Sequence, residues 1–180
     1  MDWGQVVSGL IGAGLGTAIV EGAVTIFQQF RAGRSHGKFL AFRIAVELEA
    51  YAERCLNVIF DTHNYESSRG AMGKLFVSLP PFPSYPDDIE GWRNLPPQVL
   101  DMAYRLRAQH DSKQHGLDFL LNNIGFEEAS EQCMAHCATL GRDALRIAAS
   151  IRQYYGFPTI SEEQAELLDI ETRRPEHGAA

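Results

Sequence analysis

The run from Cys133 to Cys137, Cys-Met-Ala-His-Cys, contains the residue types that bind soft metal ions. Its two cysteines are four residues apart, so on a helix they share one face, and thiolates bind ions such as Zn²⁺. A closed zinc site takes about four ligands, and only Cys55 and one histidine are obvious additions. Both cysteines also fall in an apolar stripe, where free cysteine packs as a small hydrophobic residue. We therefore expect them in the core, and we expect no metal site and no cofactor.

A second candidate for chemistry is the adjacent pair His110 and Asp111. It resembles the His-Asp pair of the all-helical HD-type metal-dependent phosphohydrolases, which add an earlier His and a later Asp. His63 and Asp143 stand in that order here, and the resemblance, limited to these residues, implies a hydrolase. The alternative is a hydrogen-bonded core histidine beside a solvated acid. No Ser-His-Asp signature, phosphate-binding loop or H-E-x-x-H motif occurs, so an enzyme is the less favoured class.

The most distinctive segment is apolar and lies at the N-terminus. Between Trp3 and Phe30 the only charged side chain is Glu21. A helix over residues 6–27 would be about 33 Å long, which matches a bilayer core of about 30 Å. Aromatic residues flank the segment at both ends, as is common at membrane interfaces. We therefore expect residues 1–30 to form a single transmembrane anchor.

Three other interpretations of this apolar segment each require particular sequence features. A cleavable signal peptide needs a basic N-terminal region, whereas the only charge there is Asp2. A dinucleotide-binding fingerprint needs glycine at position 17, which is Thr17, and strand–helix alternation after it. A buried helix of a soluble bundle is the remaining alternative, and the many glycines and Glu21 favour it.

Basic residues follow the apolar segment and none precedes it. The positive-inside rule therefore places the C-terminal side in the cytoplasm, and three unpaired cysteines fit a reducing compartment. We expect a single-pass protein of the inner (cytoplasmic) membrane with its N-terminus outside. Residues 31–38 form a basic juxtamembrane joint in which Arg31, Arg34 and Lys38 bind lipid headgroups.

Charge and composition also limit the classes of partner. Residues 1–43 carry a net charge of +2 (four basic, two acidic), and residues 44–180 carry −9 (twelve basic, twenty-one acidic). An acidic body does not suit a nucleic-acid binder, whose affinity depends on phosphate contacts from basic residues. The expected partners are the lipid bilayer, further copies of the chain and an unidentified protein.

Two faces of the predicted membrane helix carry residues that avoid lipid. One face carries Gly9, Gly12 and Gly16, and the last two form a G-x-x-x-G pair that lets helices approach closely. The opposite face carries Glu21 in a polar stripe, and an intramembrane carboxylate usually faces protein or water. We expect the helix to contact two neighbours through these faces. The alternatives are that Glu21 reaches the cytoplasmic interface, or that the protein is a pore-forming, holin-like accessory. The other members of the polar stripe are Thr17, Thr25 and Gln28.

The remainder of the chain predicts an all-α fold. Apolar positions spaced three and four residues apart indicate long helices over residues 39–63, 96–123 and 127–155, and a capping box predicts a short helix over 162–170. Together they form an antiparallel helical bundle over residues 39–158, followed by the short helix and a frayed tail over 159–180. The predicted stripes are Ala41, Ile44, Leu48, Tyr51, Cys55 and Val58; Val99, Ala103, Leu106, His110, Lys113, Leu117, Leu120 and Ile124; and Cys133, Cys137, Leu140, Ala144, Ile147, Ile151 and Tyr154.

A long proline-rich loop over residues 64–94 joins the first two helices of the bundle. Its aromatic residues predict that it packs back onto the helices, although its Pro-x-x-Pro spacing would also suit a polyproline ligand. The sequence as a whole predicts a membrane-anchored helical scaffold or interaction protein that self-associates. The loop aromatics are Phe76, Phe82, Tyr85 and Trp92.

Overall fold

The computed structural model describes residues 15–158. It contains four helices and, within those residues, no strand, which confirms the all-α prediction. The helices are α2 (Leu15–Ser67), α3 (Ile89–Arg93), α4 (Pro97–Asn123) and α5 (Phe126–Tyr155).

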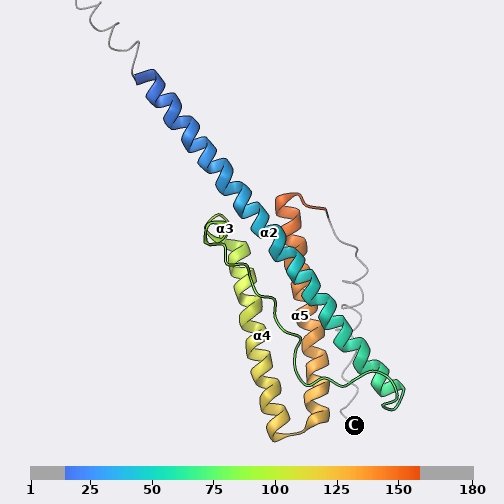
Figure 1. The fold of residues 1–180 in the computed structure, drawn as a ribbon. Helices are drawn as coiled ribbons and strands as arrows, with labels where there is room; N and C mark the ends of the chain where they lie inside the picture. Colours follow the sequence, from blue (N-terminus) through green and yellow to red (C-terminus); the bar gives the residue numbers. More distant parts are fainter. Residues whose placement is uncertain (1–14, 159–180) are drawn as a thin grey trace, which may run out of the picture.

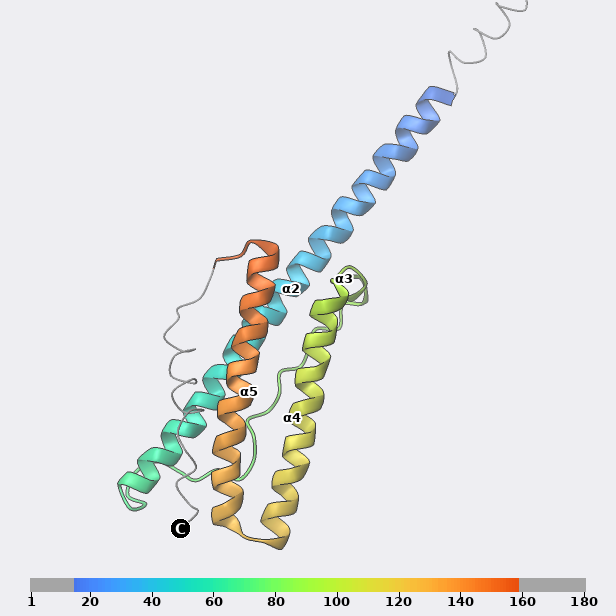
Figure 2. The ribbon, with the colours of Figure 1, turned by 180° about the vertical axis from the view of Figure 1, so that it is seen from behind.

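Helix α5 lies at the centre of the fold, because it packs against both α2 and α4. Figures 1 and 2 show that α5 runs antiparallel to the other two long helices, whereas α2 and α4 run in the same direction. The predicted antiparallel bundle is therefore only partly right. The physical reason is the connection after α2, which returns along the whole bundle before α3 and α4 begin (Figure 1).

The returning loop is held by specific contacts. The Tyr85 hydroxyl donates to the Ala103 carbonyl at 3.0 Å, and the Gln114 side-chain oxygen accepts from the Leu79 N–H at 2.8 Å. The prediction that the loop packs back is thus confirmed, since its four aromatic residues lie against the core. Phe82 of the loop packs against both Tyr51 of α2 and His110 of α4, so the loop contacts both helices.

Helix ends follow local chemistry. Helix α4 begins at Pro97, where proline is tolerated because a first-turn N–H has no helical acceptor. Helix α5 ends at Gly156, which adopts the left-handed conformation with φ of 66°. The predicted bounds of these two helices are confirmed to within about two residues.

The predicted core stripes are mostly buried. Two of their terminal members are wrong: Ile124 is 59% exposed and Tyr154 is 67% exposed. Ile124 is the residue that follows α4, and Tyr154 lies in the last turn of α5. The buried members are Ala41, Ile44, Leu48, Tyr51, Cys55 and Val58 on α2, Val99, Ala103, Leu106, His110 and Leu117 on α4, and Cys133, Cys137, Leu140, Ala144 and Ile151 on α5.

Helix α2 is continuous through residues 31–38, where the sequence suggests a joint. A glycine inside a helix costs only about 1 kcal/mol relative to alanine, which the adjoining turns can offset. Gly37 also has a packing role, because an added Cβ would lie 2.8 Å from the Asn94 carbonyl oxygen. A bulkier residue would therefore push the loop after α3 away from α2.

The first part of α2 extends beyond the bundle as a single helix, well past the ends of α4 and α5 (Figures 1 and 2). We call residues 15–36 the projecting segment; at 1.5 Å per residue it is about 33 Å long. Among the described residues, no helix combines the length and the apolar character needed to cross a membrane. The first part of the predicted span, which includes Gly9 and Gly12, lies outside the described residues. The short helix predicted at 162–170 lies outside them as well.

Candidate functional site at the base of the projecting helix

The residues predicted to contact lipid or a second helix, as far as the structure describes them, belong to α2. Gly16, Glu21, Arg31 and Arg34 lie in the projecting segment of α2. Lys38 comes one turn later, where α2 enters the bundle, and its side chain is exposed. Its ammonium nitrogen lies 5.4 Å from the centroid of the Phe157 ring, a cation–π distance. The predicted headgroup ligand Lys38 is therefore also part of the bundle's end.

Four aromatic rings form a continuous cluster at this end. Phe42 contacts Phe157 edge-on at a centroid distance of 5.3 Å, Phe157 stacks on Tyr155 at 5.7 Å, and Tyr155 meets Tyr154 at 5.0 Å. We call these residues the aromatic cluster. It joins the last turn of α5 to the first bundle turn of α2, so it fixes the direction in which the projecting segment leaves the bundle.

The same end carries a nearly buried ion pair. Arg152 donates from Nε to one oxygen of Glu49 at 2.6 Å and from Nη2 to the other at 2.9 Å. Its third nitrogen donates to the Pro158 carbonyl at 2.8 Å. The hydrogen bonds to Glu49 raise the pKa of Arg152 above its usual value. This arrangement ties α5, the chain after it and α2 together at the base of the projecting segment.

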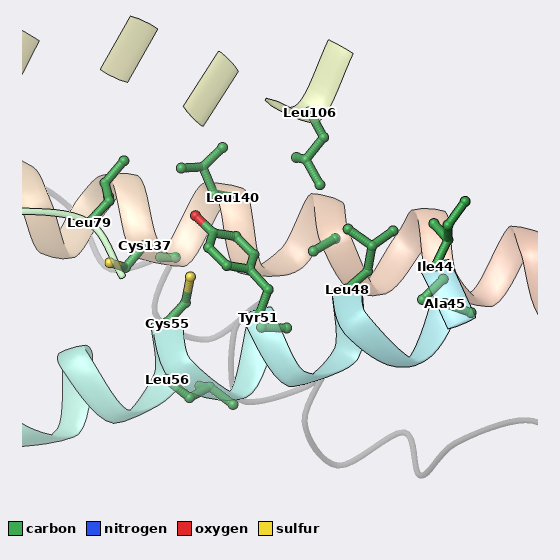
Figure 3. Packing of buried hydrophobic residues seen from close by; sticks show 14 of the residues in the cluster. Ile44, Ala45, Leu48, Tyr51, Cys55, Leu56, Leu79, Leu106, Cys137 and Leu140 are labelled. Atoms are coloured by element: carbon green, nitrogen blue, oxygen red, sulfur yellow. The ribbon is translucent and has the colours of Figure 1, made fainter. Parts of the chain in front are cut away.

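At this base α2 also carries three exposed apolar residues, of which Phe42 belongs to the aromatic cluster as well. Phe39 is 61% exposed, and Phe42 and Val46 are each 40% exposed. Their spacing of three and four residues places them on one face, which we call the outer face. Figure 3 shows the opposite face, from which Ile44 and Leu48 point toward α5. The sequence contained this signal, but the core stripe beside it took precedence in the prediction.

The three cysteines converge in the core, as the sequence predicts. Cys55 of α2 lies beside Cys137 of α5 (Figure 3), and every cysteine is fully buried. Hydrogen bonds with Cys133 and Cys55, together with burial, raise the pKa of the Cys137 thiol. Within residues 15–158, no group of three histidine, cysteine, aspartate or glutamate side chains is placed to hold a metal ion. The three thiols pack together in the core as small side chains.

His110 anchors the returning loop. Its Nε2 lies 3.1 Å from the Pro80 carbonyl and donates to it, and its Nδ1 lies 3.2 Å from the Asp111 carboxylate. Its ring also packs against Phe82 and Tyr51 at centroid distances of 5.3 Å and 5.9 Å. Both ring nitrogens therefore have partners, and the residue holds the fold together as the core-histidine interpretation predicts.

Lys113 and His136 form the polar contact between α4 and α5. Lys113 Nζ donates to His136 Nδ1 at 3.2 Å. Burial, together with the nearby lysine charge, lowers the pKa of His136 to about 4. His136 is therefore a neutral acceptor at neutral pH. In the sequence, His136 stands out only as a possible metal ligand within the Cys133–Cys137 run. Its contact with Lys113 joins two helices, so no local sequence pattern indicates it.

Comparison with known proteins adds no relative. No family model, no curated protein and no solved structure matches the chain.

Proposed function

We propose that the chain is a membrane-anchored helical scaffold. In this proposal the N-terminal part of α2 crosses the bilayer, the bundle stands in the cytoplasm, and copies of the chain associate through α2. Arg31 and Arg34 lie just after the membrane segment and bind anionic headgroups. Lys38 stands farther out and contributes to the same positive field.

The observation that carries the proposal is the continuity of α2. The helix passes without interruption from the nearly uncharged segment before Phe30 into the core stripe that begins at Leu40. Among the described residues, no other helix runs alongside residues 15–30 (Figures 1 and 2). A bilayer, whose apolar core is about 30 Å thick, would cover the apolar residues there.

Two stripes of the sequence support association of the membrane helices. Gly12 and Gly16 permit close approach of one neighbour. Glu21 lies on a different side of the helix, and a carboxylate inside a membrane usually faces protein or water. Contacts on both sides would build a cluster of helices, and each bundle would then be held close to the others.

The proposal is tested by separating membranes from supernatant after an alkaline wash. The full chain is expected in the membrane pellet. The double variant Leu15→Lys, Ile19→Lys is expected in the supernatant, because each lysine near the centre of a span raises the free energy of membrane insertion by about 3 kcal/mol. The matched control Phe119→Lys changes an exposed residue at the far end of the bundle and should stay in the pellet. Recovery of the unaltered chain in the supernatant would overturn the proposal.

A further inference from the structure

The seam between α4 and α5 contains a cation without an acidic partner. Lys113 is half-buried where the two helices lie side by side (Figure 1), and its ammonium donates to His136 Nδ1 at 3.2 Å. Among residues 15–158, no carboxylate lies within ion-pair distance of this ammonium. The half-buried acid of α5, Asp143, is paired with Arg146 instead. A partly desolvated charge is unfavourable until it meets an opposite charge.

The contact with His136 does not compensate the lysine charge. His136 is neutral at neutral pH, because burial and the nearby lysine charge lower its pKa to about 4. A lysine ammonium has three N–H donors, and the imidazole accepts one of them. The other two donors and the full positive charge of Lys113 are therefore available to a negatively charged acceptor.

An open groove adjoins Lys113 along α4. Its volume is about 480 Å³, which falls within the range of about 300–1,000 Å³ typical of sites for small organic ligands. Its lining residues follow one another at helical spacings of three and four, so they share one side of α4. The groove has room for a molecule larger than a bare ion. The lining residues are Arg105, Ala108, Gln109, Ser112 and Lys113.

The polar side chains of this groove supply hydrogen-bond donors. The Gln109 amide and the Ser112 hydroxyl lie within about one helical turn of Lys113, and each can donate. Arg105 lies eight residues before Lys113, about 12 Å along the helix axis. Its Nε donates to the Asp101 carboxylate at 2.8 Å, which offsets its charge. Lys113 is thus the cation of the groove whose charge is not offset.

We propose that this groove binds a small organic anion through a carboxylate or phosphate group placed on the Lys113 ammonium. The anionic oxygens accept from Lys113, Gln109 and Ser112, and the body of the ligand lies along α4 toward Arg105. Hydrogen bonds to an ionised acceptor are shorter and stronger than neutral ones. Because residues 44–180 carry a net charge of −9 (twelve basic, twenty-one acidic), the anion is held by these local contacts. The inference concerns the bundle and does not depend on the membrane anchor.

Titration with two probe anions tests this inference. Inorganic phosphate and acetate are added separately to the full chain in mild detergent, at constant pH and ionic strength, and the NMR signals of the His136 ring are followed. Saturable binding with a dissociation constant in the millimolar range is expected for at least one probe. Lys113→Gln removes the charge and should weaken that binding about tenfold or more. Arg107→Gln removes the same charge from the same helix and is the matched control, because Arg107 lies over the ring of Phe82 and outside the groove.

A second pair of variants leaves the charge unchanged. Ser112→Ala removes one donor of the groove and should weaken binding about threefold, whereas Ser150→Ala, at an exposed serine of α5, should not. Binding of phosphate alone would identify a phosphate ligand, and binding of acetate alone would identify a carboxylate. Absence of saturable binding for both probes would overturn the inference. Equal weakening by Lys113→Gln and Arg107→Gln would overturn it as well, because it would show general attraction to positive charge.

Discussion

Arg152 of α5 and Glu49 of α2 form a bidentate ion pair, although the two residues are 103 positions apart in the chain. Their side chains are only 9% and 12% exposed. The pair lies at the base of the projecting segment, beside Phe42, whose ring centroid is 5.5 Å from the Arg152 guanidinium carbon. Together, the pair and the aromatic cluster join the end of α5 to α2 at the base of the projecting segment.

Breaking this pair should destabilise the bundle strongly. Arg152→Met leaves Glu49 buried without its cation, which costs about 3 kcal/mol. The free energy of unfolding is measured by urea denaturation of the full chain in mild detergent. The double variant Arg152→Met, Glu49→Leu should regain most of the loss. The control Arg146→Met removes an exposed partner of Asp143 and should change stability by less than about 0.5 kcal/mol. Equal losses for Arg152→Met and the control would contradict the assignment.

Stability should fall as the solution is acidified from pH 6.5 toward pH 4. The pKa of His136 is lowered from 6.5 to about 4 in the folded protein, so in this window the unfolded chain binds more protons than the folded one. The contribution to stability is complete above pH 6.5 and is lost as pH falls through about 4. Because the histidine is only half buried, we expect an effect of about 1 kcal/mol.

The variant His136→Gln checks this dependence. It should flatten the plot of unfolding free energy against pH between 4 and 6.5. His115→Gln, which replaces an exposed histidine on α4, serves as the control and should leave the slope as it is. An unaltered slope in His136→Gln would show that other groups cause the acid sensitivity.

Two glycines should respond to alanine in opposite directions. Gly73 has φ of +76°, and an added Cβ would overlap the Asp61 carbonyl oxygen, so Gly73→Ala should lose at least about 1 kcal/mol of stability. Gly116 lies within α4 with no heavy atom near the added Cβ. Gly116→Ala should therefore gain about 0.5–1 kcal/mol from helix propensity. Thermal unfolding of both variants checks the signs, and a stabilising Gly73→Ala would contradict the positive φ of Gly73.

The glycine stripe should matter for assembly and not for the fold of the bundle. Gly12→Ile and Gly16→Ile block close helix approach and are expected to lower the mass of the detergent-stable assembly. Circular dichroism should be unchanged. Gly22→Ile is the matched control, because position 22 falls outside both the glycine and the polar stripes. If all three variants keep the mass of the unaltered protein, the stripe makes no helix contact.

Much of the fold could be predicted from the sequence, because apolar residues spaced three and four positions apart mark the buried face of a helix. The stripe from Ala41 to Val58 is buried as predicted, and the ends of α4 and α5 follow from Pro97 and Gly156. The direction of α4 could not be predicted. It depends on how far the loop after α2 returns, and contacts such as that of His110 with Pro80 decide this. Such contacts join residues distant in sequence, and no local pattern encodes them.

The candidate site was only partly accessible to sequence analysis. The basic residues and Glu21 stand out by charge, whereas the pairing of Arg152 with Glu49 depends on the packing of α5 against α2. The outer face was missed for a related reason. Phe39 and Val46 lie on the side of α2 opposite the core stripe, and only the position of the bundle shows that they are exposed within residues 15–158.

The most direct test of the account is the position of two residues relative to the membrane. Asp2→Cys and Phe119→Cys are treated separately in spheroplasts with a membrane-impermeant maleimide, before and after the membrane is permeabilised. We expect Asp2→Cys to react before permeabilisation and Phe119→Cys to react only after it, since α2 would place them on opposite sides. Reaction of Phe119→Cys in intact spheroplasts, or protection of Asp2→Cys there, would contradict the account.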